Sequence, residues 1–320
     1  MSCIVRKCLA VLYIPFCFAP LATRKFSNPP SMPSAMTTPF FLGTASWTFP
    51  DWQRVFYPDG LADRDRLAWY ATQCNSVEVN TSFYGLPAPA TLVQWVESVP
   101  PGFTFSLKAP KLITHERRLV DCKQESLAFL DVLRSLGDAV APGLLQFPPS
   151  FTRAREGRIL AGYLDWLAGE LDGLALTVEV RSADLMTPAF ARFLVERGMT
   201  LAAVERTGTD DFFAAWEEAA PPYLFLRLIG NDGEPLPNDR EIQRPHEEIL
   251  DLWAERIVGL LEKGVPVYCY THNTLEGHSP ASLRRLRERI HARYPLPDWS
   301  PEMVVAENDD SASTGQLTLF

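Results

Sequence analysis

The sequence lacks the short motifs that commonly bind nucleotides or zinc. Its 18 glycines form neither GxGxxG nor GxxxxGK, so neither glycine-rich phosphate-binding loop is present. Its six cysteines form no CxxC pair, which leaves no zinc motif and no disulfide framework and favours a reducing compartment. The five histidines show no HxH or HExxH spacing. We therefore assign no metal ligand, and the sequence leaves the cofactor unknown.

Basic residues and long apolar runs are also scarce. Thirty Lys and Arg stand against 39 Asp and Glu, giving a net charge of −9. A protein that grips nucleic acid nonspecifically presents a basic surface, so we expect no such binding, although a local basic pocket remains compatible with this charge. No apolar run reaches the roughly 20 residues of a spanning helix, so we expect no membrane partner and a cytoplasmic location.

The two ends of the chain differ from its middle. Arg6 and Lys7 precede an apolar run from Cys8 to Ala22, which is the pattern of a secretory signal. The alternative is that translation begins at Met36. In either case we expect residues 1–38 to be a disordered leader, residues 39–294 to form one domain and residues 295–320 to form a flexible acidic tail.

Between these ends, short β-rich segments alternate with amphipathic ones. The expected strands are 41–47, 76–84, 104–110, 143–147, 174–181, 200–206, 223–229 and 265–272. The expected helices are 61–74, 89–99, 124–136, 154–171, 188–196, 210–219, 247–262 and 281–294. Eight strand–helix units over about 250 residues predict an α/β fold, a single-domain (β/α)8 TIM barrel. The rival is a doubly wound sheet, which often carries a glycine-rich first loop.

Polar residues follow or end nearly every expected strand, where the active sites of such barrels lie. We predict as catalytic residues Glu78, Glu179, Glu205 and His115. We predict as substrate-binding residues Trp47, Asn80, Tyr84, Lys108, Arg181, Arg227 and Asn273. The basic ones indicate a small anionic ligand, with further cations at Lys111, Arg117 and Arg118 on the loop after the third strand.

Glu78, Asn80 and Ser82 alternate along one expected strand and would share a side. Two alternatives to catalysis remain open for the predicted residues. The pairs Glu179–Arg181 and Glu205–Arg227 could instead be ion pairs that fill the barrel mouth. The acidic residues could also hold a divalent metal together with His115 or His272.

Several sequence blocks resemble the YecE-like family, a group of unknown function with a TIM-barrel fold. The blocks are Gly43–Trp47, Asn75–Tyr84, Phe105–Pro110, Ile113–Leu119, Leu144–Phe151, and Asn273 with the residues Glu276 to His278. The resemblance covers residues 40 to 294 and implies the barrel but no reaction. The chain departs from the family pattern at Arg227-Leu-Ile-Gly, where the family has Arg-x-His-Gly, and at His272 before Asn273.

The chain ends in an apolar pentapeptide after an acidic stretch of small residues. This peptide, formed by Gln316, Leu317, Thr318, Leu319 and Phe320, resembles the motif by which bacterial proteins bind the DNA sliding clamp. The alternative is a terminal segment packed on the barrel. Three functions are compatible with these features: an enzyme such as a hydrolase that acts on an anionic substrate; an adaptor tethered to the sliding clamp; and a nuclease associated with DNA repair.

Overall fold

The computed structural model describes residues 38–205, 210–231, 233–234 and 236–304. Within these ranges, none of the helices combines the length and the apolar character needed to cross a membrane. The strands are β1 (Phe40–Thr44), β2 (Ser76–Val79), β3 (Thr104–Leu107), β4 (Gly143–Gln146), β5 (Leu176–Glu179), β6 (Met199–Leu201), β7 (Ala203–Val204), β8 (Leu224–Leu228) and β9 (Val267–Thr271).

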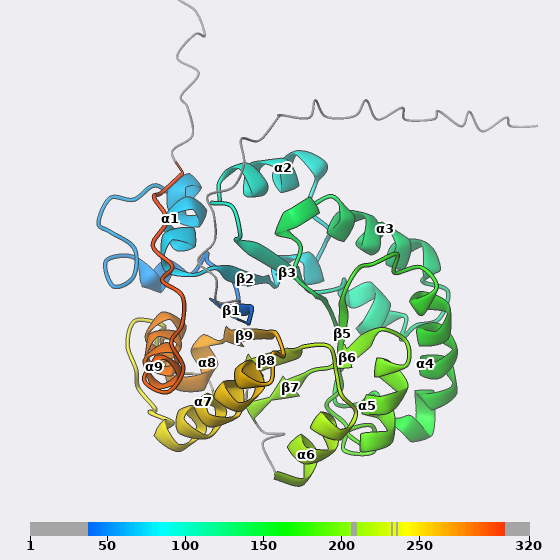
Figure 1. The fold of residues 1–320 in the computed structure, drawn as a ribbon. Helices are drawn as coiled ribbons and strands as arrows, with labels where there is room; N and C mark the ends of the chain where they lie inside the picture. The colour runs from blue at the N-terminus through cyan, green and yellow to red at the C-terminus, as the bar shows by residue number, and fades with distance from the viewer. Residues whose placement is uncertain (1–37, 206–209, 232, 235, 305–320) are drawn as a thin grey trace, which may run out of the picture. The chain divides into compact units, whose positions relative to one another are not determined.

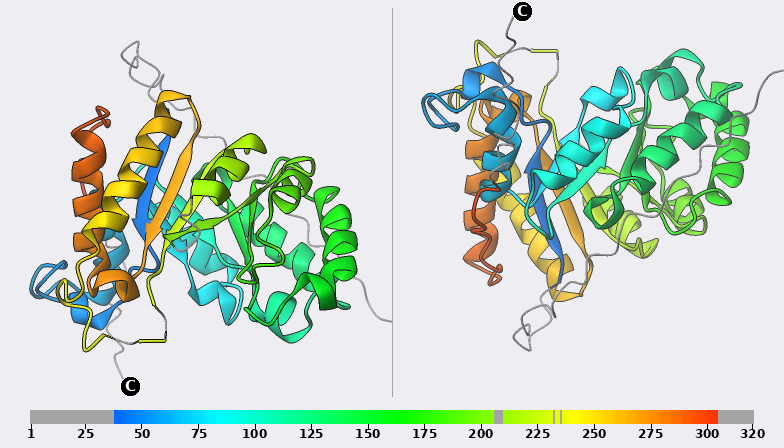
Figure 2. Two further views of the ribbon diagram at one scale, coloured as in Figure 1. Left: turned by 90° about the horizontal axis from the view of Figure 1, so that it is seen from below. Right: turned by 90° about the horizontal axis from the view of Figure 1, so that it is seen from above.

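The strands close into a barrel through three hydrogen-bonded arcs, all parallel. The arcs are β2-β3, β4-β5-β6 and β7-β8-β9-β1. Single bridges join the arcs, Ala45 to Glu78 between β1 and β2 and Lys108 to Leu144 between β3 and β4. At the third junction, β6 and β7 form one strand position interrupted at Ala202. Strands β1 and β9 come from opposite ends of the barrel sequence and lie side by side (Figure 2).

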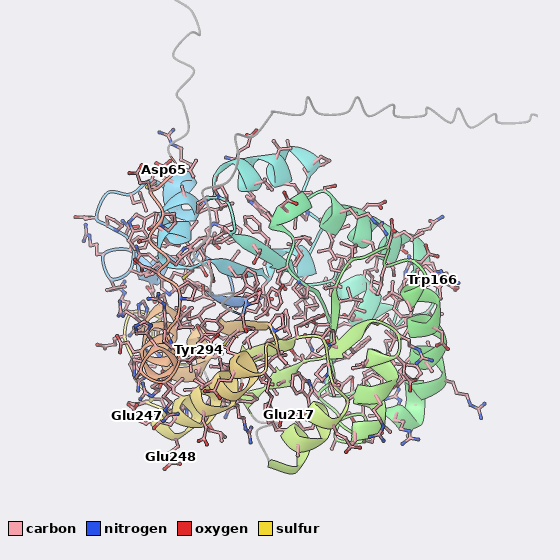
Figure 3. All side chains as sticks on the ribbon, viewed as in Figure 1. Asp65, Trp166, Glu217, Glu247, Glu248 and Tyr294 are labelled. Carbon is pink, nitrogen blue, oxygen red and sulfur yellow. The ribbon has the colours of Figure 1, made fainter. Side chains whose placement is uncertain are left out.

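Helices surround the strands and bury their outward faces (Figure 1). The long ones are α1 (Arg66–Gln73), α2 (Pro89–Glu97), α3 (Lys123–Arg134), α4 (Arg153–Ala168), α5 (Pro188–Val195), α6 (Asp210–Glu218), α7 (Glu247–Glu262) and α9 (Ser279–His291). Acidic side chains such as Glu217, Glu247 and Glu248 lie at the periphery (Figure 3). The strands are buried on both faces, as expected for a parallel barrel covered by helices, so the alternation of the sequence correctly predicted the TIM barrel.

Different hydrophobic clusters cover the outer and the inner faces of the strands. The larger lies between strands and helices and consists mainly of aliphatic and aromatic side chains. A smaller cluster, made of Leu144, Ala202, Tyr223, Phe225 and Tyr270, lies apart from it. Hydroxyl groups neighbour this smaller cluster, since Ser76 Oγ lies 2.8 Å from Tyr270 Oη and Thr177 Oγ1 lies 3.1 Å from Tyr223 Oη. The inward side of the barrel is therefore already polar below its mouth.

Tyr70 of α1 replaces the missing hydrogen-bond ladder between β1 and β2. Its hydroxyl donates to Ser76 O at 3.0 Å and accepts from Thr44 N at 2.8 Å. Glycine at position 43 allows this close approach, because a Cβ there would lie 2.0 Å from Ser76 O. Gly43 is thus required by the packing of two backbones.

Several expected boundaries were wrong. Strand β2 ends at Val79 and a 3-10 turn, Thr81–Phe83, follows, so Asn80 and Ser82 do not continue the alternation of Glu78. Ser82 Oγ instead lies within hydrogen-bond distance of the carbonyls of Val79 and Lys108, at 2.8 and 2.7 Å, and its single hydrogen can be directed to either. Residues 295–304, which we had placed in the tail, contact the barrel: Leu296 is buried, and Trp299 Nε1 donates to Ala71 O at 2.9 Å.

The substitution Gly43→Ala should destabilise the barrel by about 2–3 kcal/mol or more, because the new methyl group would overlap the Ser76 carbonyl. The matched control is Gly162→Ala in α4, where a Cβ meets no atom within 4 Å. That variant should be more stable by about 0.5–1 kcal/mol, since alanine favours the helix. Urea unfolding of the two variants measures both changes, and equal stabilities would contradict the role of Gly43.

Candidate functional site

The site is built by the two-residue period of the strands at their carboxyl ends. On each strand an inward residue of the lower layer is followed two positions later by a polar residue at the mouth. These successions are Ser76 and Glu78, Ser106 and Lys108, Thr177 and Glu179, Phe225 and Arg227, and Tyr270 and His272. The strand register therefore brings together side chains that lie nearly 200 residues apart in the sequence.

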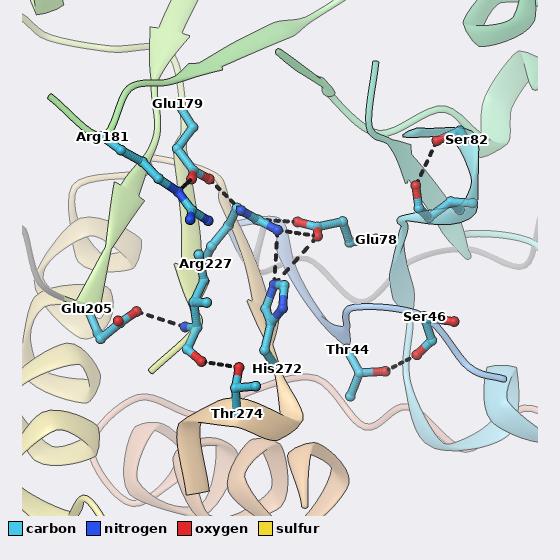
Figure 4. A network of polar contacts seen from close by, with 12 residues as sticks. Thr44, Ser46, Glu78, Ser82, Glu179, Arg181, Glu205, Arg227, His272 and Thr274 are labelled. Carbon is cyan, nitrogen blue, oxygen red and sulfur yellow. Dashed lines mark hydrogen bonds and ion pairs between the residues drawn. The ribbon is translucent and has the colours of Figure 1, made fainter. Parts of the chain in front are cut away.

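Arg227 occupies the centre of this layer (Figure 4). Its Nε and Nη2 donate to the two carboxylate oxygens of Glu78 at 2.6 and 2.7 Å, a bidentate pair. Its Nη1 donates to Glu179 Oε2 at 2.5 Å, and Arg181 Nε donates to the other oxygen of Glu179 at 3.0 Å. Nη2 also lies 3.1 Å from His272 Nε2. Since a guanidinium can only donate, His272 Nε2 accepts in this contact and its proton is placed on Nδ1.

Burial and charge act in opposite directions on the two carboxyl groups. Burial alone would raise the pKa of Glu78, yet the charge of Arg227 holds that pKa well below its ordinary value. The pKa of Glu179 is likewise lowered, because the charges of Arg227 and Arg181 outweigh its burial. Both groups are ionised at neutral pH, although each is about 1% exposed or less. Neither carboxyl can therefore donate a proton near pH 7.

Lys108 and His115 lie beside this cluster and pack on one aromatic ring. Lys108 Nζ lies 4.0 Å from the centre of the Phe83 ring, and the His115 ring contacts the same ring edge-on at 4.9 Å. Burial, together with the charge of Arg227, lowers the pKa of Lys108 to about 8. Burial and the charges of Lys108 and Arg181 lower the pKa of His115 to about 4. Near neutral pH, His115 is thus uncharged and Lys108 loses its proton readily.

The other basic residues of the loop after β3 form ion pairs with glutamates outside this cluster. Lys111 pairs with Glu116 at 3.0 Å, Arg117 with Glu125 at 2.8 Å, and Arg118 with the buried Glu156 at 2.5 Å. We therefore no longer expect these three cations to bind an anion. The loop carries a π-helix, Leu112–Glu116, that presents His115, and such irregular turns are common at functional sites.

A cavity of about 340 Å³ lies on the other side of His272. It is lined by Ala45, Ser46, Phe49, Asn80, Thr81, Tyr84, Asp239, His272, Asn273 and Thr274. Three predicted ligand-binding residues, Asn80, Tyr84 and Asn273, thus meet in one cavity. Trp47 is not among its lining residues, because its indole packs edge-on against Trp95 at 5.3 Å.

Glu205 lies at the end of β7, where its Oε2 accepts a hydrogen bond from Ile229 N at 2.7 Å. Sequence reasoning missed Phe83, which packs against both Lys108 and His115. It also missed Asp239, which lies on the loop between β8 and α7, where no periodic pattern singles out a residue. Gln316, Leu317, Leu319 and Phe320 lie outside the described residues. Within the described ranges, no three His, Cys, Asp or Glu side chains are grouped as a metal site would require.

Replacing Arg227 with Met should cost about 3–5 kcal/mol of stability at pH 7, because it leaves Glu78 buried without an arginine partner and leaves Glu179 with the partly exposed Arg181 alone. In the wild type, the ion pairs of Arg227 with Glu78 and Glu179 stabilise the folded state at any pH above the ordinary Glu pKa of about 4.3. This contribution is lost as the pH falls through the lowered pKa values of the two folded-state carboxyl groups. In Arg227→Met the buried carboxyls should have raised pKa values, so its deficit should shrink as the pH falls from 7 towards 4.

Urea unfolding across this pH range measures the deficit. Arg227→Lys, which keeps the charge but loses the bidentate pair, provides a milder second variant. Lys263→Met breaks an exposed ion pair with Glu217 and should cost less than about 1 kcal/mol at every pH. A deficit of Arg227→Met that does not change with pH would contradict the assignment of both carboxylates to Arg227.

Comparison with known proteins places this geometry in a family. The model of the family described as "Protein of unknown function DUF72" matches residues 41–304. The chain is 31% identical over 170 residues to UPF0759 protein YecE of Escherichia coli K12, a match that covers 53% of the chain and 58% of that protein. The chain thus matches less than two thirds of this relative's length.

Solved structures of the same family share the fold. A DUF72 family protein of Enterococcus faecalis V583 superposes with a TM-score of 0.63 at 19% identity, covering 82% of this chain and 98% of that one. One from Thermotoga maritima MSB8 gives a TM-score of 0.62 at 24% identity, covering 78% and 98%. The match of the family model over most of the chain settles the assignment: the protein belongs to the DUF72 family, to which the YecE proteins are related.

Proposed function

We propose that the barrel mouth binds a small anionic substrate and catalyses proton transfer on it, as in a hydrolysis or an isomerisation. The observation that carries this proposal is the environment of Lys108. Its ammonium group is largely buried on Phe83, and within the described part of the chain it forms no ion pair. A phosphate or carboxylate of the substrate would supply the missing counter-charge.

The positive charges around Lys108 favour the same ligand. Arg227 and Arg181 both lower the pKa of Lys108, while Glu78 and Glu179 raise it too little to overcome burial. The two carboxylates hold Arg227 and are not aimed at Lys108. An anion beside Lys108 would lower the electrostatic energy of the whole cluster, so binding and protonation of Lys108 should be coupled.

This geometry changes the roles that the sequence indicated. Glu78 and Glu179 are fully ionised and hydrogen-bonded to arginine, so we propose that they position Arg227 and do not exchange protons with the substrate. Lys108 has a pKa of about 8 without a bound anion, and an anion beside it would raise this pKa, so Lys108 carries its proton in the complex. We therefore propose that Lys108 binds the anionic group as an ammonium and can donate a proton to the substrate, with His115 and Arg181 beside it as further ligands of the anion.

Phosphate should raise the pKa of Lys108 from about 8 towards the ordinary lysine value of about 10.4. The pH titration of dimethylated lysines by NMR, with and without 20 mM phosphate (about an order of magnitude above a millimolar Kd), measures the shift. Lys108→Met should remove the shifted signal and weaken phosphate binding at least tenfold. Lys263→Met, which removes an exposed lysine, should leave the binding unchanged.

An unshifted Lys108 in the presence of phosphate, together with unchanged phosphate binding by Lys108→Met, would exclude the anion site. Loss of binding in Lys263→Met to the same extent as in Lys108→Met would show that only net charge matters.

As a second function, we propose that the chain docks on the bacterial sliding clamp through its last five residues. This rests on the sequence alone, on the match of Gln316 to Phe320 to the clamp-binding pattern after an acidic stretch. Docking would tether the barrel near DNA without requiring a basic surface, which agrees with the net charge of −9. A cytoplasmic location stays a prediction that both functions share.

The tail proposal predicts that the full chain binds purified clamp and that a chain ending at Gly315 does not. Leu319→Ala with Phe320→Ala should weaken binding at least tenfold, because these side chains would fill the clamp pocket. Calorimetric titration measures the affinity, and Lys108→Met serves as a control that should bind the clamp normally. Equal binding by the full and the shortened chain would end this proposal.

A further inference from the structure

The cavity beside His272 is lined by a buried hydrogen-bond donor that has no partner of good geometry among the described residues. Asn273 is 6% exposed and lines this cavity. Its Oδ1 accepts two hydrogen bonds, from Ser279 N at 2.9 Å and from Ser279 Oγ at 2.7 Å. These bonds fix the amide, so its Nδ2 points away from Ser279. Nδ2 makes no hydrogen bond of good geometry to the described residues, although the carboxyl group of Asp239, whose pKa Asn273 lowers, lies near it. Such an unmet donor costs about 1–3 kcal/mol unless a ligand satisfies it.

A buried acceptor lines the same cavity. Asn80 Oδ1 is buried and has no hydrogen-bond partner within the described ranges. The cavity therefore offers at least one donor and one acceptor that protein atoms leave unused. A hydroxyl group can both donate and accept, so a ligand with several hydroxyls can bond to either amide.

The other walls suit a polyhydroxylated molecule. Phe49 and Tyr84 supply ring surface, and the Tyr84 side chain is 78% exposed. Ser46 has φ of +84°, a left-handed conformation that costs energy for a serine and is found at ligand sites. Asp239 adds a carboxyl group whose pKa is raised by burial and by Asp51 and lowered by Asn273. Amide, hydroxyl and carboxyl groups beside aromatic rings match the hydroxyls and the C–H faces of a sugar.

His272 connects this cavity to the cationic cluster. It lines the cavity, and its Nε2 lies 3.1 Å from Arg227, whose partner Glu179 also binds Arg181. We infer that the cavity binds the polyhydroxylated end of the substrate and that Lys108 binds its anionic end, which makes the substrate class a sugar phosphate or sugar acid. This inference rests on the proposed function, because Lys108 holds the charged end.

Three probes separate the two ends of the ligand. Ribose 5-phosphate and glucose 6-phosphate carry a phosphate and several hydroxyls, whereas n-butyl phosphate carries the phosphate alone. In the wild type, at least one of the sugar phosphates should bind tenfold or more tightly than n-butyl phosphate, by calorimetric titration. The ratio of the two affinities reports on the hydroxyls, because the phosphate charge is the same in both ligands.

Two variants should remove this ratio. Asn273→Asp keeps an oxygen for Ser279 and replaces the unused donor with an acceptor. Asn80→Ala removes an oxygen that makes no hydrogen bond to the residues that the structure describes, so it should fold normally. Both should reduce the ratio towards one. The matched control is Asn231→Asp, the same substitution at an exposed position outside the cavity, which should keep the wild-type ratio.

The outcomes distinguish this inference from the proposed function. A ratio near one in the wild type, with binding of all three probes still dependent on Lys108, would overturn the sugar subsite and leave the anion site intact. A sugar preference that survives in both variants would also overturn the subsite. Binding that is absent, or indifferent to Lys108→Met, would overturn the anion site and this inference with it.

Discussion

The pairing of Arg227 with Glu78 and Glu179 is the interaction on which the rest of the site depends. A guanidinium, 2% exposed, lies between two carboxylates that are more deeply buried still. Each of these three charges would be strongly unfavourable alone in the barrel, and the short hydrogen bonds among them offset that cost. The cluster also orients His272 through its acceptor nitrogen. Replacing Arg227 by a neutral residue would leave buried negative charge at the centre of the mouth, whereas loss of one carboxylate would leave Arg227 paired with the other.

Much of the fold could be predicted from the sequence, because a parallel barrel buries its strands on both faces and so leaves short apolar runs at regular intervals. The ends of the strands were less predictable. Asn80 and Ser82 continue the two-residue period of Glu78 and look like strand residues, yet the chain turns after Val79, where the Ser82 hydroxyl can bond to either of two carbonyls. A local side-chain hydrogen bond therefore accompanies the end of the strand, and the alternation of polar and apolar residues in the sequence does not reveal such a bond.

The predicted barrel was enough to indicate that four side chains meet at its mouth, namely those of Glu78, Glu179, Lys108 and Arg227. It did not indicate the role of each. Strand register decides that these side chains meet, whereas the direction of each side chain decides which ones pair. The two carboxylates look like acid–base groups in the sequence because nothing there reveals that both of them face Arg227. Asp239 was not predictable, since it reaches the cavity from a loop that is fixed by remote contacts, such as the one between its carbonyl and His278.

The wall of the barrel is discontinuous, since its strands form three arcs that are joined by isolated bridges and by the interrupted strand position at Ala202. Glu78 belongs to the first arc, Glu179 to the second, and Arg227 to the third. Arg227 thus links the three arcs through its ion pairs, at junctions where the strands share few backbone hydrogen bonds. The site and the closure of the barrel therefore depend on the same side chain, so a substitution at Arg227 should affect both.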